Sequence, residues 1–77
     1  MKATEFVGPS KLDTEPEGVF VPQSQRREAI EDALRDVDLG EFDRYMIKWM
    51  VGILDETVVQ TLVSWLLRVH AAAGDLE

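Results

Sequence analysis

Two acidic residues, Asp55 and Glu56, divide the longest apolar run of the chain, residues 49–70. A membrane-spanning helix needs roughly 20 consecutive apolar residues, whereas the longest stretch without a charge in this run is residues 57–67. Asp55 can instead cap a helix, because its carboxylate accepts hydrogen bonds from the unpaired amides of a first turn. The sequence therefore predicts two consecutive helices that meet at Asp55, and no membrane segment.

An irregular arm is predicted before the helices, at residues 1–23. It holds all three prolines of the chain and shows no helical periodicity. Ser24 is then the expected N-cap of a first helix, residues 24–37, whose apolar positions fall on one stripe. We expect the apolar segment at residues 19–21 to pack against the helices, because a disordered polar arm would not carry three large apolar residues in a row.

Two further helices are predicted from capping signals. Asp38 and Glu41 have the spacing of a capping box at the start of a second helix, residues 39–53. The third helix, residues 55–73, is expected to stop at Gly74, since glycine adopts the backbone conformation that commonly ends a helix.

The predicted fold class is all-α, a three-helix domain over residues 24–74 that follows the N-terminal arm. A tail at residues 75–77 comes after it. An expression vector can supply the pair Leu76-Glu77, so we assign the tail no function.

The second and third helices differ in how their apolar residues are distributed. Those of the second helix recur at the spacing of one helical face, which predicts a buried face. They are Phe42, Tyr45, Met46, Trp49, Met50 and Ile53. The polar residues of the third helix fill a sector of only about 100°, which leaves nearly all the rest apolar. They are Gln60, Thr61, Ser64 and Arg68.

A chain of 77 residues without cysteine buries only about 60% of its unfolded surface, and no disulfide can stabilise it. Two neighbouring helices and an arm cannot enclose a third helix that is apolar over about 260° of its circumference. We therefore predict a homodimer in which helices of both copies form a four-helix or larger bundle. The predicted interface residues are Trp49, Leu62, Trp65, Leu66 and Val69. The alternative is a monomer in which Val19, Phe20 and Val21 of the arm cover the third helix.

The acidic composition disfavours binding to nucleic acid. Fifteen acidic and eight basic residues give a net charge of -7, which repels phosphates. In a helix-turn-helix protein the third helix would read DNA, but here it carries one arginine and no lysine. We therefore predict a small acidic helical module for protein-protein interaction. The alternative function is a nucleic-acid-linked regulator, which would bind DNA through Arg26, Arg27 and Arg44 or mimic DNA with an acidic strip. That strip comprises Glu28, Glu31, Asp32, Asp36, Asp38, Glu41 and Asp43.

No pattern of catalytic, cofactor-binding or metal-binding residues is found, so we predict a non-enzymatic protein without a cofactor or metal. His70 is the single histidine, and we expect it to interact with the last carbonyl groups of the third helix. Residues 13–18 resemble the start of a calcium loop, but Ser24 stands where such a loop requires a bidentate glutamate. Ser24 and Ser64 lie in no nucleophile motif.

Residues 39–68 read LGxxDxxxIxWxxxxxDxTVxxxxxSxxxR, a pattern that resembles small uncharacterised proteins of actinobacteria and their phages. The resemblance implies a phage or mobile-element origin and names no function. The N-terminal segment lacks the apolar region of a secretory signal, which predicts a cytoplasmic location, where a further partner would be a host or phage protein.

Overall fold

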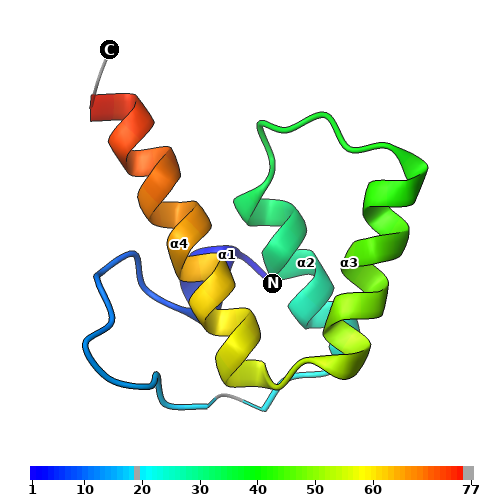
Figure 1. Ribbon diagram of the computed structural model, residues 1–77, viewed down its shortest axis with the longest axis horizontal. Coiled ribbons are helices and arrows are strands. Elements are labelled where there is room, and N and C mark those ends of the chain that lie inside the picture. Colours follow the sequence, from blue (N-terminus) through cyan, green and yellow to red (C-terminus); the bar gives the residue numbers. More distant parts are fainter. Residues whose placement is uncertain (19, 76–77) are drawn as a thin grey trace.

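The structure, a computed structural model, describes residues 1–18 and 20–75 (Figure 1). The predicted all-α class is confirmed for these residues, which form helices and no strand. The helices are α1 (Ala3–Phe6), α2 (Gln23–Ala33), α3 (Glu41–Ile53) and α4 (Glu56–Asp75).

Helix α2 is the centre of the fold, because it contacts α1, α3 and α4. Helices α3 and α4 lie on either side of α2 and diverge from the short connection between them (Figure 1). The molecule measures 35 × 32 × 16 Å along its principal axes, so it is a flat slab with two broad faces. The buried hydrophobic residues are Ala3, Phe6, Val21, Ala29, Ile30, Ile47, Val51, Val59, Val63 and Leu67.

The prediction that the arm is irregular throughout is wrong. The arm carries α1 and belongs to the domain. Ala3 and Phe6 of α1 are buried in the core, and the Ala3 amide donates a 2.8 Å hydrogen bond to the Asp32 carboxylate of α2. Of the apolar segment expected to pack against the helices, Val21 is buried and Phe20 is exposed. Val19 lies outside the described residues.

The first predicted helix is wrong at both ends. Helix α2 begins at Gln23 after Pro22, so Ser24 lies inside the first turn and is not the N-cap. Proline suits this place because its missing amide would have had no helical partner. The helix ends at Ala33 instead of residue 37, where the Leu34 amide is shared between two carbonyl groups and the chain turns.

The predicted capping box is displaced along the chain. Helix α3 begins at Glu41, with Gly40 as the extended N-cap residue. The Asp43 carboxylate accepts a 2.9 Å hydrogen bond from the Gly40 amide, which is the return bond that a capping box provides. Asp38 and Glu41 therefore do not form the box, because Gly40 and Asp43 occupy the positions that it requires.

The boundary at Asp55 is where the sequence indicated it. Helix α4 begins at Glu56, and the Val59 amide donates to the Asp55 carbonyl oxygen at 3.1 Å. The expected stop at Gly74 is wrong, since the helix continues to Asp75. Residues 76 and 77 of the predicted tail lie outside the described residues.

Candidate interaction surface

Helix α3 turns its most apolar side away from the core. Ile47 and Val51 are 3% and 2% exposed, whereas Trp49 is 51% and Phe42 69% exposed. Successive residues of a helix are about 100° apart, so Ile47 and Val51 lie opposite Phe42 and Trp49. The prediction that the side bearing Phe42 and Trp49 is buried is therefore wrong, and α2 packs against the other side.

Helix α4 buries part of its polar sector. Gln60 and Ser64 are 2% and 0% exposed, and both bind the arm. The Gln60 amide nitrogen donates to the Phe6 carbonyl oxygen at 3.0 Å. The Ser64 hydroxyl lies 3.3 and 3.4 Å from the carbonyl oxygens of Gly8 and Ser10. Carbonyl groups at the end of a helix, such as that of Phe6, or in a loop have no partner in regular structure and need donors. The side chains of Gln60 and Ser64 provide them.

This pairing decides which side of α4 is left uncovered. The arm lies over this polar sector. Of the three arm residues expected to cover the third helix in the monomeric alternative, Val21 is buried, Phe20 is 91% exposed and Val19 lies outside the described residues. The uncovered side carries residues spaced four, three and four apart along α4, the spacing at which helices form a packed seam. We call it the α4 seam, and it consists of Val58, Leu62, Trp65 and Val69.

Helix α3 carries a seam of the same spacing on its outer side. We call it the α3 seam, and it consists of Phe42, Met46, Trp49 and Ile53. Among the described residues, most of the large hydrophobic side chains that are exposed lie on these two helices. They are Phe42, Tyr45, Trp49, Ile53, Val58, Trp65 and Val69.

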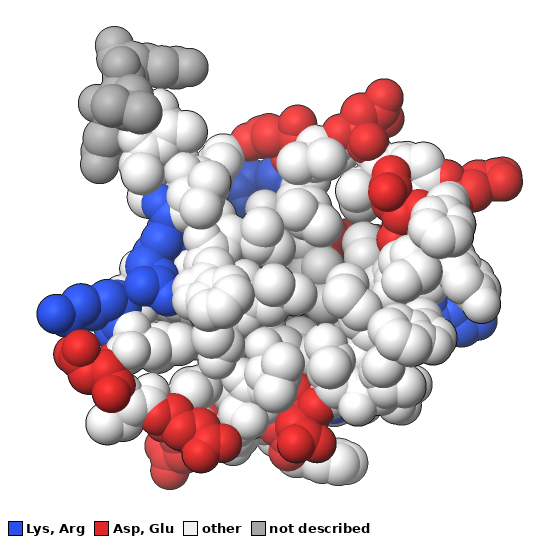
Figure 2. Space-filling view, viewed as in Figure 1, with Lys and Arg blue, Asp and Glu red and all other residues white. Residues whose placement is uncertain are grey.

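We refer to the two seams, together with the residues between them, as the apolar face. Figure 2 shows an uncharged area across the middle of this view, with acidic side chains mainly at its edge. A groove of about 350 Å³ runs between α3 and α4, and its lining contains no charged residue. It is lined by Met50, Leu54, Val58, Thr61, Leu62 and Trp65. A second hollow of about 340 Å³ lies beside Trp49 and Gly52.

The predicted interface residues lie on α3 and α4. Trp49, Trp65 and Val69 are exposed on the two helices that form the apolar face. Leu62 and Leu66 are half-buried, and of these only Leu62 lines the groove.

The prediction missed Phe42, Met50, Ile53, Leu54 and Val58 as surface residues. Their helical spacing was visible in the sequence. However, the same spacing describes a buried face and an exposed seam equally well.

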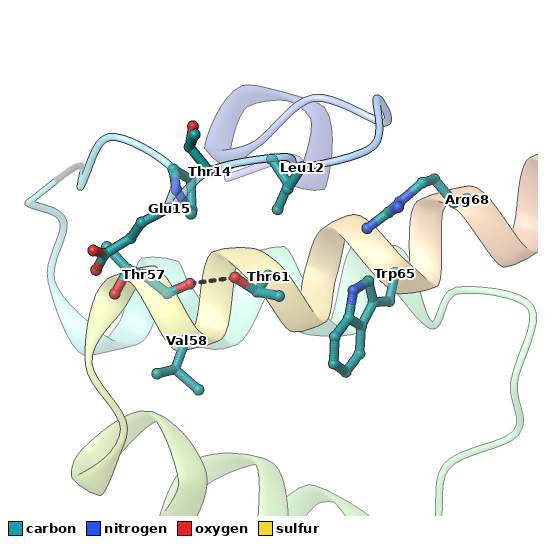
Figure 3. A pocket seen from close by; sticks show the side chains of 9 residues that line it. Leu12, Thr14, Glu15, Thr57, Val58, Thr61, Trp65 and Arg68 are labelled. Carbon is teal, nitrogen blue, oxygen red and sulfur yellow. Dashed lines mark hydrogen bonds between the residues drawn. The ribbon is translucent and has the colours of Figure 1, made fainter.

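A different crevice separates the arm from α4 and has a volume of about 440 Å³. In Figure 3, Leu12 of the arm points toward α4, whereas Val58 and Trp65 point away from the arm. The Thr61 hydroxyl donates to the Thr57 carbonyl oxygen at 2.8 Å, so it is already engaged within α4. The charged groups at the crevice are Glu15 and Arg68.

We expected His70 to interact with the end of its own helix. Its side chain instead contacts the turn that follows α2. Its Nδ1 lies 3.4 Å from the Asp36 carboxylate, and its Nε2 lies 3.3 Å from the Arg35 guanidinium. In the part of the chain that the structure describes, no three histidine or acidic side chains are placed to hold a metal ion. No helix within that part has both the length and the apolar character needed to cross a bilayer.

The proposed DNA-binding arginines do not form one open cationic surface. The Arg26 side chain is mostly buried and lies 3.9 Å from the Glu56 carboxylate. Arg44 lies 3.5 Å from the Glu31 carboxylate, whereas Arg27 lines a cleft beside Arg44.

The acidic strip is partly engaged within the fold. Asp32 accepts from the arm, Asp36 faces His70 and Asp43 caps α3. Glu28 pairs with the α-amino group of Met1. That hydrogen bond and the positive charge of the amine lower the pKa of the Glu28 carboxyl below its ordinary value.

No family model, curated protein or solved structure matches this chain. Its function therefore has to be argued from the geometry of the apolar face and from the charges around it.

Proposed function

We propose that this protein is a non-enzymatic interaction module that assembles as a homodimer through the apolar face. The observation that carries this proposal is the orientation of α3, which buries Ile47 and Val51 and leaves Trp49 exposed. Exposed apolar side chains in a contiguous area are typical of protein interfaces. A second copy that covers the α3 and α4 seams would remove them from water.

The amount of exposed surface supports this proposal. The chain has an accessible surface of 5407 Å², whereas a folded monomer of 8.7 kDa exposes about 4,700 Å². The excess is on the order of the roughly 800 Å² that each partner buries in a standard interface. Part of the excess belongs to the arm, but most of the exposed large apolar side chains lie on α3 and α4.

In the proposed dimer, α3 and α4 of each copy form a four-helix bundle. The spacing of the two seams is that of bundle and coiled-coil interfaces. Neither seam contains a charged residue, so burial leaves no charge without a partner.

Light scattering on the purified chain at micromolar concentration tests the dimer. Val69→Glu places a charge on the apolar face at a residue that is 66% exposed, so the monomer should still fold. We expect this variant to be monomeric. The control is Gln25→Glu, which adds the same charge at an exposed residue of α2 and should remain dimeric.

A wild-type chain that is monomeric across the concentration range would overturn the homodimer. A dimer that survives Val69→Glu would show that the copies associate through another surface.

The second candidate function is a nucleic-acid-linked regulator. Arg27, Arg44 and Lys48 line one cleft of about 400 Å³ between α2 and α3, together with Glu31 and Glu41. A gel shift at low salt tests direct DNA binding, since such binding should weaken as salt rises. If no shift occurs, the acidic strip could act only as a DNA mimic, and a basic protein would have to bind it.

We also propose, from the resemblance described above, that a phage or mobile element encodes the chain. A small helical module that acts on a host or phage protein fits that origin. The dimer and the gel-shift experiments do not depend on it.

A further inference from the structure

The C-terminal end of α4 extends past the ends of the other helices (Figure 1). Residues 69–73 are exposed and read VHAAA, with no acidic or basic residue other than His70. His70 faces the Asp36 carboxylate at 3.4 Å, so this helix end is held in position at its base. Apart from His70, it is a short apolar helix segment whose residues are exposed.

The groove between α3 and α4 offers the complementary shape. Its lining has no charged residue, and an apolar helix laid in an apolar groove is a common mode of recognition. Each copy of the chain therefore carries both an exposed helix end and a groove that could receive one.

We propose that the end of α4 of each copy lies in the α3–α4 groove of the other copy, with the two α4 helices antiparallel about a two-fold axis at Trp65. This inference rests on the proposed homodimer and specifies its geometry. The α4 seam continues with the same spacing from Val69 to Ala72, so the seam from Val58 to Ala72 has Trp65 at its midpoint. A two-fold interface needs a self-complementary surface of this kind.

The register of the pair follows from the position of the axis. Val58 lies opposite the partner's Ala72, and Val69 lies beside the partner's Leu62. The two Trp65 rings meet at the axis, where aromatic rings pack favourably. Alanine at residue 72 permits a close approach at the end of the groove where α3 and α4 converge.

A second copy fits this groove better than a charged peptide. The groove presents no charged side chain that would need an opposite charge in its occupant. Along its two longer axes the molecule measures 35 × 32 Å, so one side of the slab has room for the roughly 800 Å² that one partner of a standard interface buries.

Introduced cysteines test the register, because the natural chain has none. Val58→Cys and Ala72→Cys are prepared separately, mixed and oxidised. We expect a disulfide between the two different variants. Neither variant should link to itself, because like residues are about 21 Å apart along the antiparallel helices, whereas a disulfide joins Cα atoms less than about 7 Å apart.

The outcomes separate this geometry from the homodimer itself. Self-linked Val58→Cys or Ala72→Cys would indicate parallel helices and overturn the register. A dimer in light scattering that forms no disulfide in the mixture would also overturn it, while the proposed function would stand. A monomer in light scattering would overturn both.

A second pair of variants gives a readout without oxidation. Ala72→Trp places a bulky side chain opposite Val58, so we expect the dimer dissociation constant to rise at least tenfold. The control is Ala71→Trp, because this exposed residue points about 100° away from Ala72 around the helix. Equal effects of the two variants would contradict the proposed geometry.

Discussion

The side-chain amide of Gln60 donates a 3.0 Å hydrogen bond to the carbonyl oxygen of Phe6, which is 54 residues away along the chain. This bond and the Ser64 contacts with Gly8 and Ser10 hold the arm against α4. As a result, the arm covers polar residues of α4 and leaves the α4 seam exposed.

Gln60→Ala should lower the free energy of unfolding by about 1–3 kcal/mol, because it leaves a buried carbonyl group without a donor. The control is Thr61→Ala at the next residue, whose hydroxyl bonds only within α4. It should change stability by less than about 0.5 kcal/mol. Urea unfolding followed by tryptophan fluorescence measures both, and equal losses would contradict the role of the arm contact.

Ser64→Ala combined with Gln60→Ala should cost less than the sum of the two single changes. Both side chains bind the same arm segment, so after one bond is lost the segment is held less firmly. Neighbouring residues in one network commonly show coupling of about 0.5–3 kcal/mol. A double-mutant cycle measures this coupling, and strict additivity would show that the two bonds act independently.

Ile47→Ala and Ile53→Ala compare the same change on the two sides of α3. Ile47 is 3% exposed and Ile53 is 58% exposed. Ile47→Ala should destabilise the fold by about 2–5 kcal/mol at any protein concentration. Ile53→Ala should lower the melting temperature mainly at high concentration, where the dimer contributes to stability. Thermal unfolding at two concentrations would refute this assignment if Ile53→Ala gave the larger loss in the dilute sample.

Gly52→Ala should stabilise the folded monomer. A methyl group at Gly52 would meet no atom within 4 Å apart from its chain neighbours and the backbone of its own helix, and alanine is favoured over glycine inside a helix by about 0.5–1 kcal/mol. We expect a rise of a few degrees in the melting temperature of a dilute sample. Gly18→Ala is the control, since it lies in the arm and gains no helix propensity. A melting temperature unchanged by Gly52→Ala would contradict the open space around it.

Glu28→Gln should make the fold less stable at neutral pH. It should also reduce the loss of stability that occurs as the pH falls. The pKa of Glu28 is lowered by the Met1 amine. The contribution of this carboxylate to the free energy of unfolding is therefore fully present above the pKa that Glu28 has in the unfolded chain. It is lost as pH falls through the lower pKa of the folded state. Thermal unfolding at neutral pH and near pH 3 should show the two chains converging in acid. Glu17→Gln controls for the change in net charge, and a constant difference from neutral to acidic pH would argue against the pair.

The sequence by itself determined the helical class, the boundary at Asp55 and which apolar residues share one side of α3. These features depend on neighbours within a few residues, because helical periodicity and caps are local properties. The helix ends were less well predicted, since Gly40 and Asp43 compete with Asp38 and Glu41 for the same cap.

Only the tertiary structure decided which side of each helix is buried. The spacing of Phe42 and Trp49 shows that they share a side of α3, but that spacing carries no information about what α2 packs against. Likewise, the burial of Gln60 depends on a carbonyl group 54 residues away, whose need for a donor exists only once the arm has folded onto α4. Which side of α3 and α4 is exposed therefore depends on contacts between segments that are distant along the chain. A local pattern of residues could not predict it.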